Sequence, residues 1–243
     1  MTNSWVGFKR LILVDKVVEC KNVISFYFKD NNEDILPKHK AGQFLPIKLI
    51  TEDLRYKDKI RTYSLSMAPG ENIYRISVKR NPKGLISNYL HDNLNVGDAI
   101  LAAMPCGLFA VKEKSSISHI TFLSDGIGIT PLLSMMLGEV NKRPITFVES
   151  LKNSENHPFK EEIKALSDNN SIKKITLYSA PSEKDKEENI FDFKGIVNKE
   201  WISKNLDLNN SFYFCGSPIF IGSINDALIE LGVPIENIHY ESF

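Results

Sequence analysis

The chain has 243 residues, enough for one large or two ordinary domains, and its 30 basic and 30 acidic residues leave no net charge. A neutral total supplies no strong basic field of the kind that binds nucleic acid or an anionic membrane, so neither partner is expected. Three cysteines, Cys20, Cys106 and Cys215, lie far apart without a CxxC pair, which excludes a disulfide framework and a four-cysteine iron–sulfur site.

The start of the chain lacks the apolar core of a signal peptide, and no apolar run approaches the length that spans a membrane. We therefore expect a cytoplasmic protein without a membrane span. The five histidines have no partner at metal-ligand spacing, so no metal site is expected.

The first half of the chain has the pattern of short β-strands separated by polar, Gly or Pro residues. The expected strands are Leu11–Val18, Val23–Lys29, Gly42–Leu49, Thr62–Ser66, Tyr74–Lys79 and Ala99–Met104. A single helix is expected near Ile86–Asn93. Six antiparallel strands in roughly 110 residues predict a small closed β-barrel.

The second half changes to strands separated by longer segments with helical spacing. The expected strands are Ile120–Leu123, Ile145–Val148, Ile175–Tyr178, Phe212–Phe214 and Ile238–Tyr240. Strand–helix alternation predicts a five-stranded parallel sheet with helices on both faces. The polar patch Lys112–Ser116 separates the two patterns, so we predict a barrel domain over 1–113 and an α/β domain over 117–243.

The stretch Ser118–Gly138 is the centre of this organisation. A buried strand is followed by Gly126-Ile127-Gly128-Ile129-Thr130-Pro131 and then by an apolar helical run. Glycines permit a sharp turn, Thr130 is a candidate N-cap and Pro131 a candidate first helical residue. A helix start of this kind can seat a phosphate. Because Pro131 replaces the third glycine of the dinucleotide fingerprint, an ordinary strand–helix loop is the alternative.

A second group of candidate residues lies in the predicted barrel. Arg61, Tyr63 and Ser64 offer a guanidinium for phosphate, a ring that can stack on a flat heterocycle, and a hydroxyl for a ring nitrogen. A strand with an exposed Arg and a half-buried Tyr is the simpler alternative. The segment Gly84–Ser87 again has the pattern of a loop that leads into a helix, and hence of a second anion-binding site.

Seven motifs occur in the order found in ferredoxin–NADP reductase-like flavoproteins: RTYSLS, YRISVKR, GLISNYLHDNLNVGD, MPCGLF, GIGITP, FYFCGS and ENIHYESF. The chain resembles this family over nearly its whole length, and most of all the reductase part of bacterial flavohemoglobins. The resemblance implies an FAD-binding antiparallel barrel followed by an NAD(P)-binding α/β domain, which agrees with the division expected from the strand pattern.

The resemblance also implies roles for individual residues of the barrel. Arg61 would hold the FAD pyrophosphate, Tyr63 would pack on the isoalloxazine and Ser64 would lie near its N5. Ser87 would reach the pyrophosphate from its helix start. The other implied FAD contacts are Phe44, Thr62, Val78, Lys79, Gly84, Ile86 and, at the chain end, Phe243.

In the second domain the resemblance places the NAD(P)H pyrophosphate at Gly126–Pro131 and the nicotinamide beside Cys215, Gly216 and Ser217. Glu241 would lie near the flavin, so Ser64, Cys215 and Glu241 are the implied catalytic residues. Cys215 as a small buried residue and Glu241 as a solvated carboxylate are the alternatives. The implied reaction is hydride transfer from nicotinamide to flavin, followed by electron release to an acceptor.

The chain shows neither a globin segment nor the cysteines of a plant-type ferredoxin. We therefore expect electrons to pass to a separate protein, such as a ferredoxin, heme or iron–sulfur protein, or to a small acceptor. A reductase of free flavin or ferric chelates and a non-catalytic nucleotide-binding regulatory module are the alternatives.

Asp125 stands where similar proteins usually carry a small residue, and its charge would repel a pyrophosphate. We expect Asp125→Ala to tighten NAD(P)H binding. Glu149, at the end of the second α/β strand, is a candidate acceptor for a ribose 2′-hydroxyl, and the segment Tyr178–Ser182 contains no Arg for a 2′-phosphate. NADH is therefore preferred over NADPH.

Overall fold

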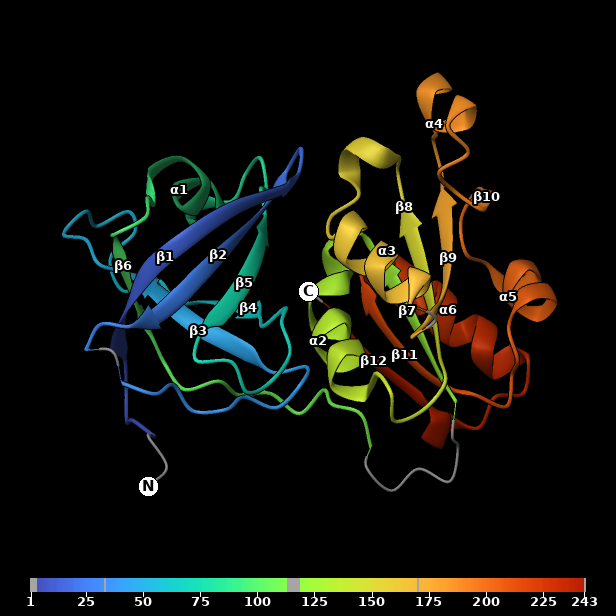
Figure 1. Ribbon diagram of the computed structural model, residues 1–243, viewed down its shortest axis with the longest axis horizontal. Coiled ribbons are helices and arrows are strands. Elements are labelled where there is room, and N and C mark those ends of the chain that lie inside the picture. Colours follow the sequence, from blue (N-terminus) through green and yellow to red (C-terminus); the bar gives the residue numbers. More distant parts are fainter. Residues whose placement is uncertain (1–3, 33, 113–118, 170, 243) are drawn as a thin grey trace. The chain divides into compact units, whose positions relative to one another are not determined.

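The computed structural model describes residues 4–32, 34–112, 119–169 and 171–242 (Figure 1). Its contacts divide the chain into two compact units, one of residues 1–110 with Leu133–Gly138 and one of Val111–Leu132 with Glu139–Phe243. The predicted domain boundary falls largely on residues 113–118, which lie outside the described residues, so the predicted limits stay a prediction.

The first unit is built on one antiparallel sheet of six strands. The strands are β1 (Lys9–Cys20), β2 (Val23–Asp30), β3 (Phe44–Leu49), β4 (Arg61–Ser64), β5 (Tyr74–Lys79) and β6 (Ala99–Ala102). Their order is β4-β3-β6-β1-β2-β5. A bridge between Leu65 and Ile76 joins the two edge strands and closes the sheet, which removes the exposed edges. The predicted six-stranded barrel is confirmed.

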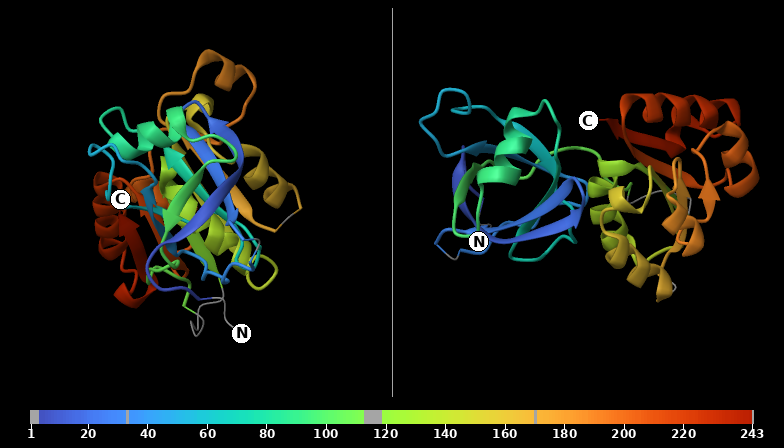
Figure 2. Two further views of the ribbon diagram at one scale, coloured as in Figure 1. Left: turned by 90° about the vertical axis from the view of Figure 1, so that its left-hand side faces the viewer. Right: turned by 90° about the horizontal axis from the view of Figure 1, so that it is seen from above.

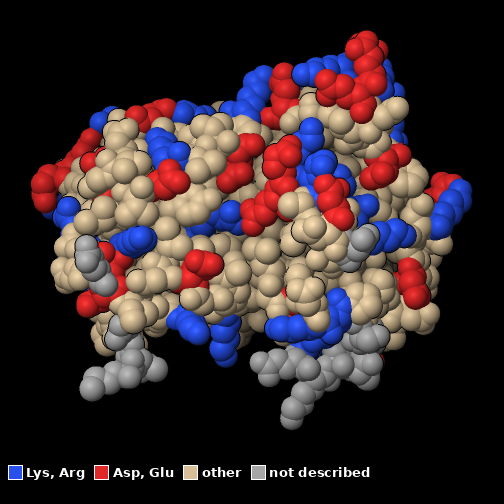
Figure 3. Space-filling model, viewed as in Figure 1, with Lys and Arg blue, Asp and Glu red and all other residues tan. Residues whose placement is uncertain are grey.

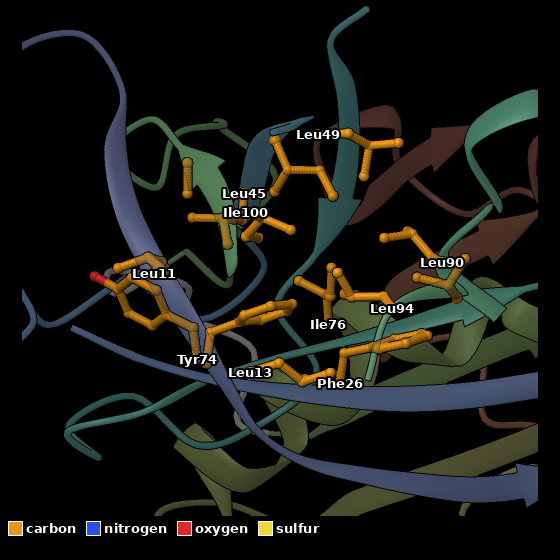
Figure 4. Close-up of a cluster of buried hydrophobic side chains, with 14 of the residues drawn as sticks. Leu11, Leu13, Phe26, Leu45, Leu49, Tyr74, Ile76, Leu90, Leu94 and Ile100 are labelled. Carbon is orange, nitrogen blue, oxygen red and sulfur yellow. The ribbon is translucent and has the colours of Figure 1, made fainter. Parts of the chain in front are cut away.

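Alternation along each strand directs one set of side chains into the barrel. Figure 4 shows this cluster, in which Phe26, Leu45, Tyr74, Ile76 and others converge from separate strands. Helix α1 (Leu85–Asn93) covers one end of the barrel, because its Leu90 joins the same core (Figures 1 and 2). Burial of these apolar side chains supplies the main driving force for folding this unit.

The second unit contains a parallel sheet of six strands. They are β7 (Ile120–Asp125), β8 (Ile145–Leu151), β9 (Lys173–Tyr178), β10 (Phe193–Lys194), β11 (Ser211–Gly216) and β12 (Ile238–Ser242), in the order β10-β9-β8-β7-β11-β12. All five predicted strands are confirmed. The sixth, β10, was missed because it has only two residues, both exposed, and so lacks an apolar pattern.

Helices cover both faces of this sheet (Figures 1 and 2). Those on one face are α2 (Ile129–Glu139) and α3 (Lys160–Asp168), and those on the other are α5 (Lys199–Asn205) and α6 (Pro218–Glu230). The short α4 (Glu183–Glu187) follows β9, and short 3₁₀ turns occur at Gly126–Gly128, Ser154–Asn156 and Ile235–Asn237. Strand β7 has β8 on one side and β11 on the other, so the strand order reverses between β7 and β11. Ligands of open α/β sheets bind at the carboxyl ends of the strands at such a switch point.

No helix among the described residues is both long and apolar enough to span a bilayer. On the face drawn in Figure 3, Lys and Arg side chains are interspersed with Asp and Glu. That face therefore presents no field of a single sign.

Candidate functional site

Strand β4 carries the first group of predicted site residues. Tyr63 lies opposite Leu45 in β3 and packs against the barrel core, and burial raises the pKa of its hydroxyl to about 12. Ser64, the last residue of β4, is 5% exposed, and its hydroxyl has no hydrogen-bond partner among the described residues. Thr62 is exposed. A hydroxyl without a protein partner keeps its donor and acceptor capacity for a ligand atom, so Ser64 is suited to bind one.

The Arg61 side chain at the start of β4 is free to bind an anion. It is exposed, and its guanidinium donates to the Ile60 carbonyl at 2.7 Å. No carboxylate lies within ion-pair distance of it in the part of the chain that is described. Most N–H donors of the Arg61 guanidinium therefore remain available for a phosphate.

Phe44 begins β3 directly opposite Ser64. Its backbone exchanges hydrogen bonds with Cys106, and its ring packs over Gly107, where a Cβ atom would lie only 3.1 Å from the ring. The ring is half-buried. Phe44 therefore stands on the same side of the sheet as the free Ser64 hydroxyl.

The end of β5 and the start of α1 hold the next predicted residues. Val78 is buried in the barrel core, while its carbonyl lies 2.8 Å from Nε2 of His91. Lys79 is exposed. At the start of α1, Gly84 is the N-cap without a side-chain hydrogen bond to the helix. A Cβ atom there would lie 2.4 Å from Oγ of Ser87 and 2.9 Å from Cβ of Asn81, so a side chain at this position would displace one of these neighbours.

Ile86 and Ser87 in the first turn of α1 differ in their surroundings. Ile86 belongs to the barrel core, which fixes the helix in place, whereas the Ser87 hydroxyl accepts from the Asn81 backbone N–H at 3.3 Å. The Ser87 hydroxyl still has a proton to donate. Phe243, the last predicted FAD contact, lies outside the described residues.

A buried polar chain in the barrel was not found from the sequence. The Ser77 hydroxyl lies 2.7 Å from the Ser66 hydroxyl and 2.7 Å from the Ser25 hydroxyl. The Ser25 hydroxyl in turn donates to the Glu19 carboxylate at 2.6 Å. Arg75, almost fully buried, donates from Nε to the Ser66 hydroxyl at 3.1 Å. Arg75 and Ser77 alternate with apolar residues along β5, which marks them as one face of the strand. Their partners, however, come from β1, β2 and the segment after β4, which no local pattern connects.

In the second unit the glycine loop is confirmed as a tight turn that leads into a helix, although its start differs from the expectation. Gly126 has φ +54°, and Gly126–Gly128 forms a 3₁₀ turn that runs directly into α2 at Ile129. The prediction of Thr130 as N-cap was wrong, because the helix has already begun there and the Thr130 hydroxyl donates to the Ile127 carbonyl at 3.0 Å. Pro131 therefore lies inside the first turn rather than opening it.

The glycine loop packs directly against the end of β11. A Cβ atom at Gly128 would lie 2.0 Å from the Cys215 carbonyl oxygen and 2.8 Å from the Gly216 nitrogen. No side chain fits at this position without moving backbone. Ser217 follows as N-cap of α6, accepting from the Phe220 N–H at 3.3 Å, and Pro218 is the first helical residue.

Asp125, which immediately precedes the glycine loop, contacts Gly216 and Ser217 at the end of β11. It ends β7, and its Oδ2 accepts from the Ser217 hydroxyl at 2.7 Å and from the Ser217 N–H at 3.3 Å. Its side chain also lies over Gly216, where a Cβ atom would come within 2.6 Å of the Asp125 Cβ. The carboxylate is thus fixed across the switch point between β7 and β11.

Cys215 is fully buried between the two neighbouring strands, opposite Ser124 in β7 and Glu241 in β12. Burial, with smaller contributions from the charges of Glu241 and Asp125, raises the pKa of its thiol well above the ordinary value. Burial also raises the pKa of the half-buried Glu241. The carboxyl edge of β7, β11 and β12 therefore holds a protonated thiol and two carboxyl groups.

The expected role of Glu149 is not supported by its surroundings. Its side chain is 1% exposed, with Oε2 at 2.9 Å from His157 Nε2 and Oε1 accepting from the Thr176 hydroxyl at 3.1 Å. His157 is in turn 2.8 Å from the Tyr178 hydroxyl. Because both carboxylate oxygens are engaged in the interior, Glu149 is not placed to accept a ribose hydroxyl.

Two domain families match the chain in the order that the architecture indicates. Residues 10–111 match the family described as oxidoreductase FAD-binding domain, and residues 122–226 match the oxidoreductase NAD-binding domain. The chain belongs to the FAD- and NAD-binding oxidoreductases. The resemblance to ferredoxin–NADP reductase-like flavoproteins is thereby confirmed, and this oxidoreductase binds FAD and NAD(P)H.

Relatives and solved structures cover nearly all of the oxidoreductase. Flavohemoproteins of Bacillus cereus and Dictyostelium discoideum are each 38% identical over 99% of this chain. The chain spans only 62% and 61% of their respective lengths. The flavohem-like FAD/NAD binding domain of nitric oxide dioxygenase from Vibrio cholerae superposes with a TM-score of 0.85 at 28% identity, covering 97% of this chain and 98% of that one.

Proposed function

We propose that this NAD(P)H-dependent flavoprotein oxidoreductase takes its reducing equivalents from NADH and passes electrons through FAD to a separate acceptor protein. The observation that carries the residue assignments is the neighbouring pair Tyr63 and Ser64 at the end of β4, in a barrel of the FAD-binding family. Tyr63 offers a half-buried ring, and Ser64 a hydroxyl without a hydrogen-bond partner among the described residues. Ring and hydroxyl together suit a flat heterocycle with a hydrogen-bonding edge.

On the barrel, Tyr63 would pack on the isoalloxazine while Ser64 binds near its N5. Arg61 and the first turn of α1 at Gly84 and Ser87 would hold the pyrophosphate, because both offer donors that no carboxylate occupies. Phe44, Thr62, Ile86, Val78 and Lys79 would complete the cradle, the last two through their backbone. Phe243 stays a prediction from the resemblance.

In the second unit, Gly126–Pro131 would seat the nucleotide pyrophosphate at the start of α2, whose first turn carries no acidic residue. Cys215, Gly216 and Ser217 would line the nicotinamide, and Glu241 would lie near the flavin. Bound nicotinamide supplies a hydride, which flavin N5 accepts. Ser64, Cys215 and Glu241 would exclude water and position the rings, and the raised pKa of the thiol keeps Cys215 uncharged beside them.

The preference for NADH rests on the charges after β9. Lys184 and Lys186 of α4 are the cations that follow this strand end, and they form ion pairs with Glu188 at 3.7 Å and Glu183 at 2.5 Å respectively. Their charge is thus balanced, and a 2′-phosphate would have to compete with two carboxylates.

A heme or iron–sulfur protein is the acceptor class that we propose. The relatives named flavohemoproteins combine flavin and heme in their name, which supports a heme acceptor for this chain. The three cysteines of the chain are free, which supports the cytoplasmic location that we also propose.

An anaerobic absorbance titration of the FAD-loaded protein tests the proposed function. We expect flavin bands that bleach with NADH, and at least tenfold more slowly with NADPH. Flavin that stays oxidised with both nucleotides would favour a non-catalytic module, and rapid turnover of added free flavin without a protein acceptor would favour a flavin reductase. Inability to take up FAD would overturn the proposal.

A further inference from the structure

Asp125 is held more firmly than a loop carboxylate usually is. Two donors of Ser217 bind one of its oxygens, and its Cβ packs against the Gly216 backbone. The side chain is nevertheless only half-buried, so its charge acts on whatever lies at the strand ends. A fixed charge of this kind costs no reorganisation when a ligand arrives.

The same edge carries a second carboxyl group and no balancing cation. Glu241 lies next to Cys215 across the β11–β12 pairing, and the charges of both Asp125 and Glu241 act on the Cys215 thiol. In the described part of the chain, neither Asp125 nor Glu241 forms an ion pair with Lys or Arg. The carboxyl ends of β7, β11 and β12 thus form an electronegative edge, which favours a cation.

We propose that Asp125 stabilises the positively charged ring of oxidised nicotinamide and thereby sets the relative affinity for the two redox forms of the nucleotide. The inference rests on the proposed function, which places the nicotinamide beside Cys215–Ser217. Oxidised and reduced nucleotide share the same riboses and pyrophosphate and differ in the charge of the ring. A carboxylate at this edge therefore favours binding of the oxidised form over the reduced form, because only the oxidised ring is positively charged.

The sign of the effect follows from two opposing interactions. Asp125 repels the pyrophosphate equally in both forms, but it attracts only the cationic ring of the oxidised form. Removal of its charge should therefore tighten binding of the reduced form, as expected from the sequence, and weaken binding of the oxidised form relative to it. Because positive charge develops on the ring as hydride leaves, the same attraction favours hydride donation.

Calorimetric titration of the FAD-loaded protein with NAD⁺ and with tetrahydro-NAD, a neutral-ring analogue that cannot donate hydride, measures the two affinities without turnover. Asp125→Asn keeps an oxygen that can accept from Ser217 but removes the charge. We expect it to raise the ratio of the Kd of NAD⁺ to that of the analogue about tenfold. Asp125→Ala should shift the ratio in the same direction.

The matched control is Asp226→Asn, which makes the same substitution at an exposed carboxylate of α6 that is no part of the proposed site. We expect this variant to hold the ratio within about twofold of the wild type. An unchanged ratio in Asp125→Asn, or an equal change in Asp226→Asn, would overturn the inference. Failure of the proposed function looks different, because the wild-type flavin would then not be bleached by NADH.

Discussion

Glu149 and His157 are joined by a hydrogen bond of 2.9 Å between Oε2 and Nε2, with each side chain only 1% exposed. Thr176 and Tyr178 extend this contact into a buried network that spans β8, β9 and the segment before α3. Buried polar groups are costly when a partner is lost, so such a network holds its strands in register. Glu149 is therefore a structural residue of the nucleotide-binding unit.

The first prediction concerns this network. Glu149→Ala leaves the His157 ring and the Thr176 hydroxyl without their acceptor in the interior, and we expect the free energy of unfolding to fall by about 2–4 kcal/mol. The ratio of rates with NADH and NADPH should not change, because Glu149 does not reach the nucleotide. Urea unfolding and flavin reduction measure the two effects, with the exposed residue Glu161 of α3 changed to Ala as control. Loss of NADH selectivity with intact stability would restore the role expected from the sequence.

The sequence predicted most strands well because β3 and β5 of the barrel alternate and the central strands of the parallel sheet, such as β7 and β8, are largely apolar runs. It did not predict the setting of Glu149, since β8 is buried on both faces and its pattern does not show which neighbours a side chain meets. The contact between Asp125 and Ser217 joins residues 92 positions apart. Residue types indicated the candidate site, whereas the pairing of its residues depends on the tertiary fold.

The second prediction concerns Gly128, where an added Cβ atom would overlap the Cys215 carbonyl. We expect Gly128→Ala to displace the loop, to lower stability by about 2–4 kcal/mol and to abolish reduction by NADH while FAD stays bound to the barrel. Gly222→Ala in α6 is the matched control. A Cβ atom there meets nothing within 4 Å, so stability should be unchanged or slightly raised. Full activity of Gly128→Ala would refute the loop packing.

The third prediction separates two neighbouring serines. Ser64→Ala removes a hydroxyl without a partner in the described structure, so we expect an unchanged Tm and flavin reduction at least tenfold slower. Ser66→Ala breaks the hydroxyl chain to Ser77 and Arg75, so we expect a Tm lowered by several degrees instead. Thermal unfolding and stopped-flow absorbance distinguish the two. The assignment of Ser64 fails if its variant loses stability and keeps its rate.

The fourth prediction concerns thiol reactivity. Burial and nearby carboxyl charge raise the pKa of the Cys215 thiol, and Cys215 has no exposed surface, whereas Cys106 is exposed. Iodoacetamide at pH 8 should therefore label Cys106 at least tenfold faster than Cys215. Peptide mass spectrometry over time measures both rates in one sample, and unfolding in urea should remove the difference. Equal labelling of the folded protein would contradict the burial of Cys215 against the glycine loop.

The fifth prediction concerns acid stability. His239 packs against Tyr213 with ring centroids 4.5 Å apart, and burial, together with the charge of Lys112, lowers its pKa from 6.5 to about 4. Between these values the unfolded chain binds a proton that the folded chain does not, so stability falls as the pH drops from about 6.5 toward 4. His239→Phe keeps a ring against Tyr213 but cannot titrate. We expect its Tm to fall less than that of the wild type between pH 7 and pH 5, with parallel Tm curves above pH 7, where the histidine is neutral in both states. Equal losses on acidification would show that His239 contributes nothing to the acid sensitivity.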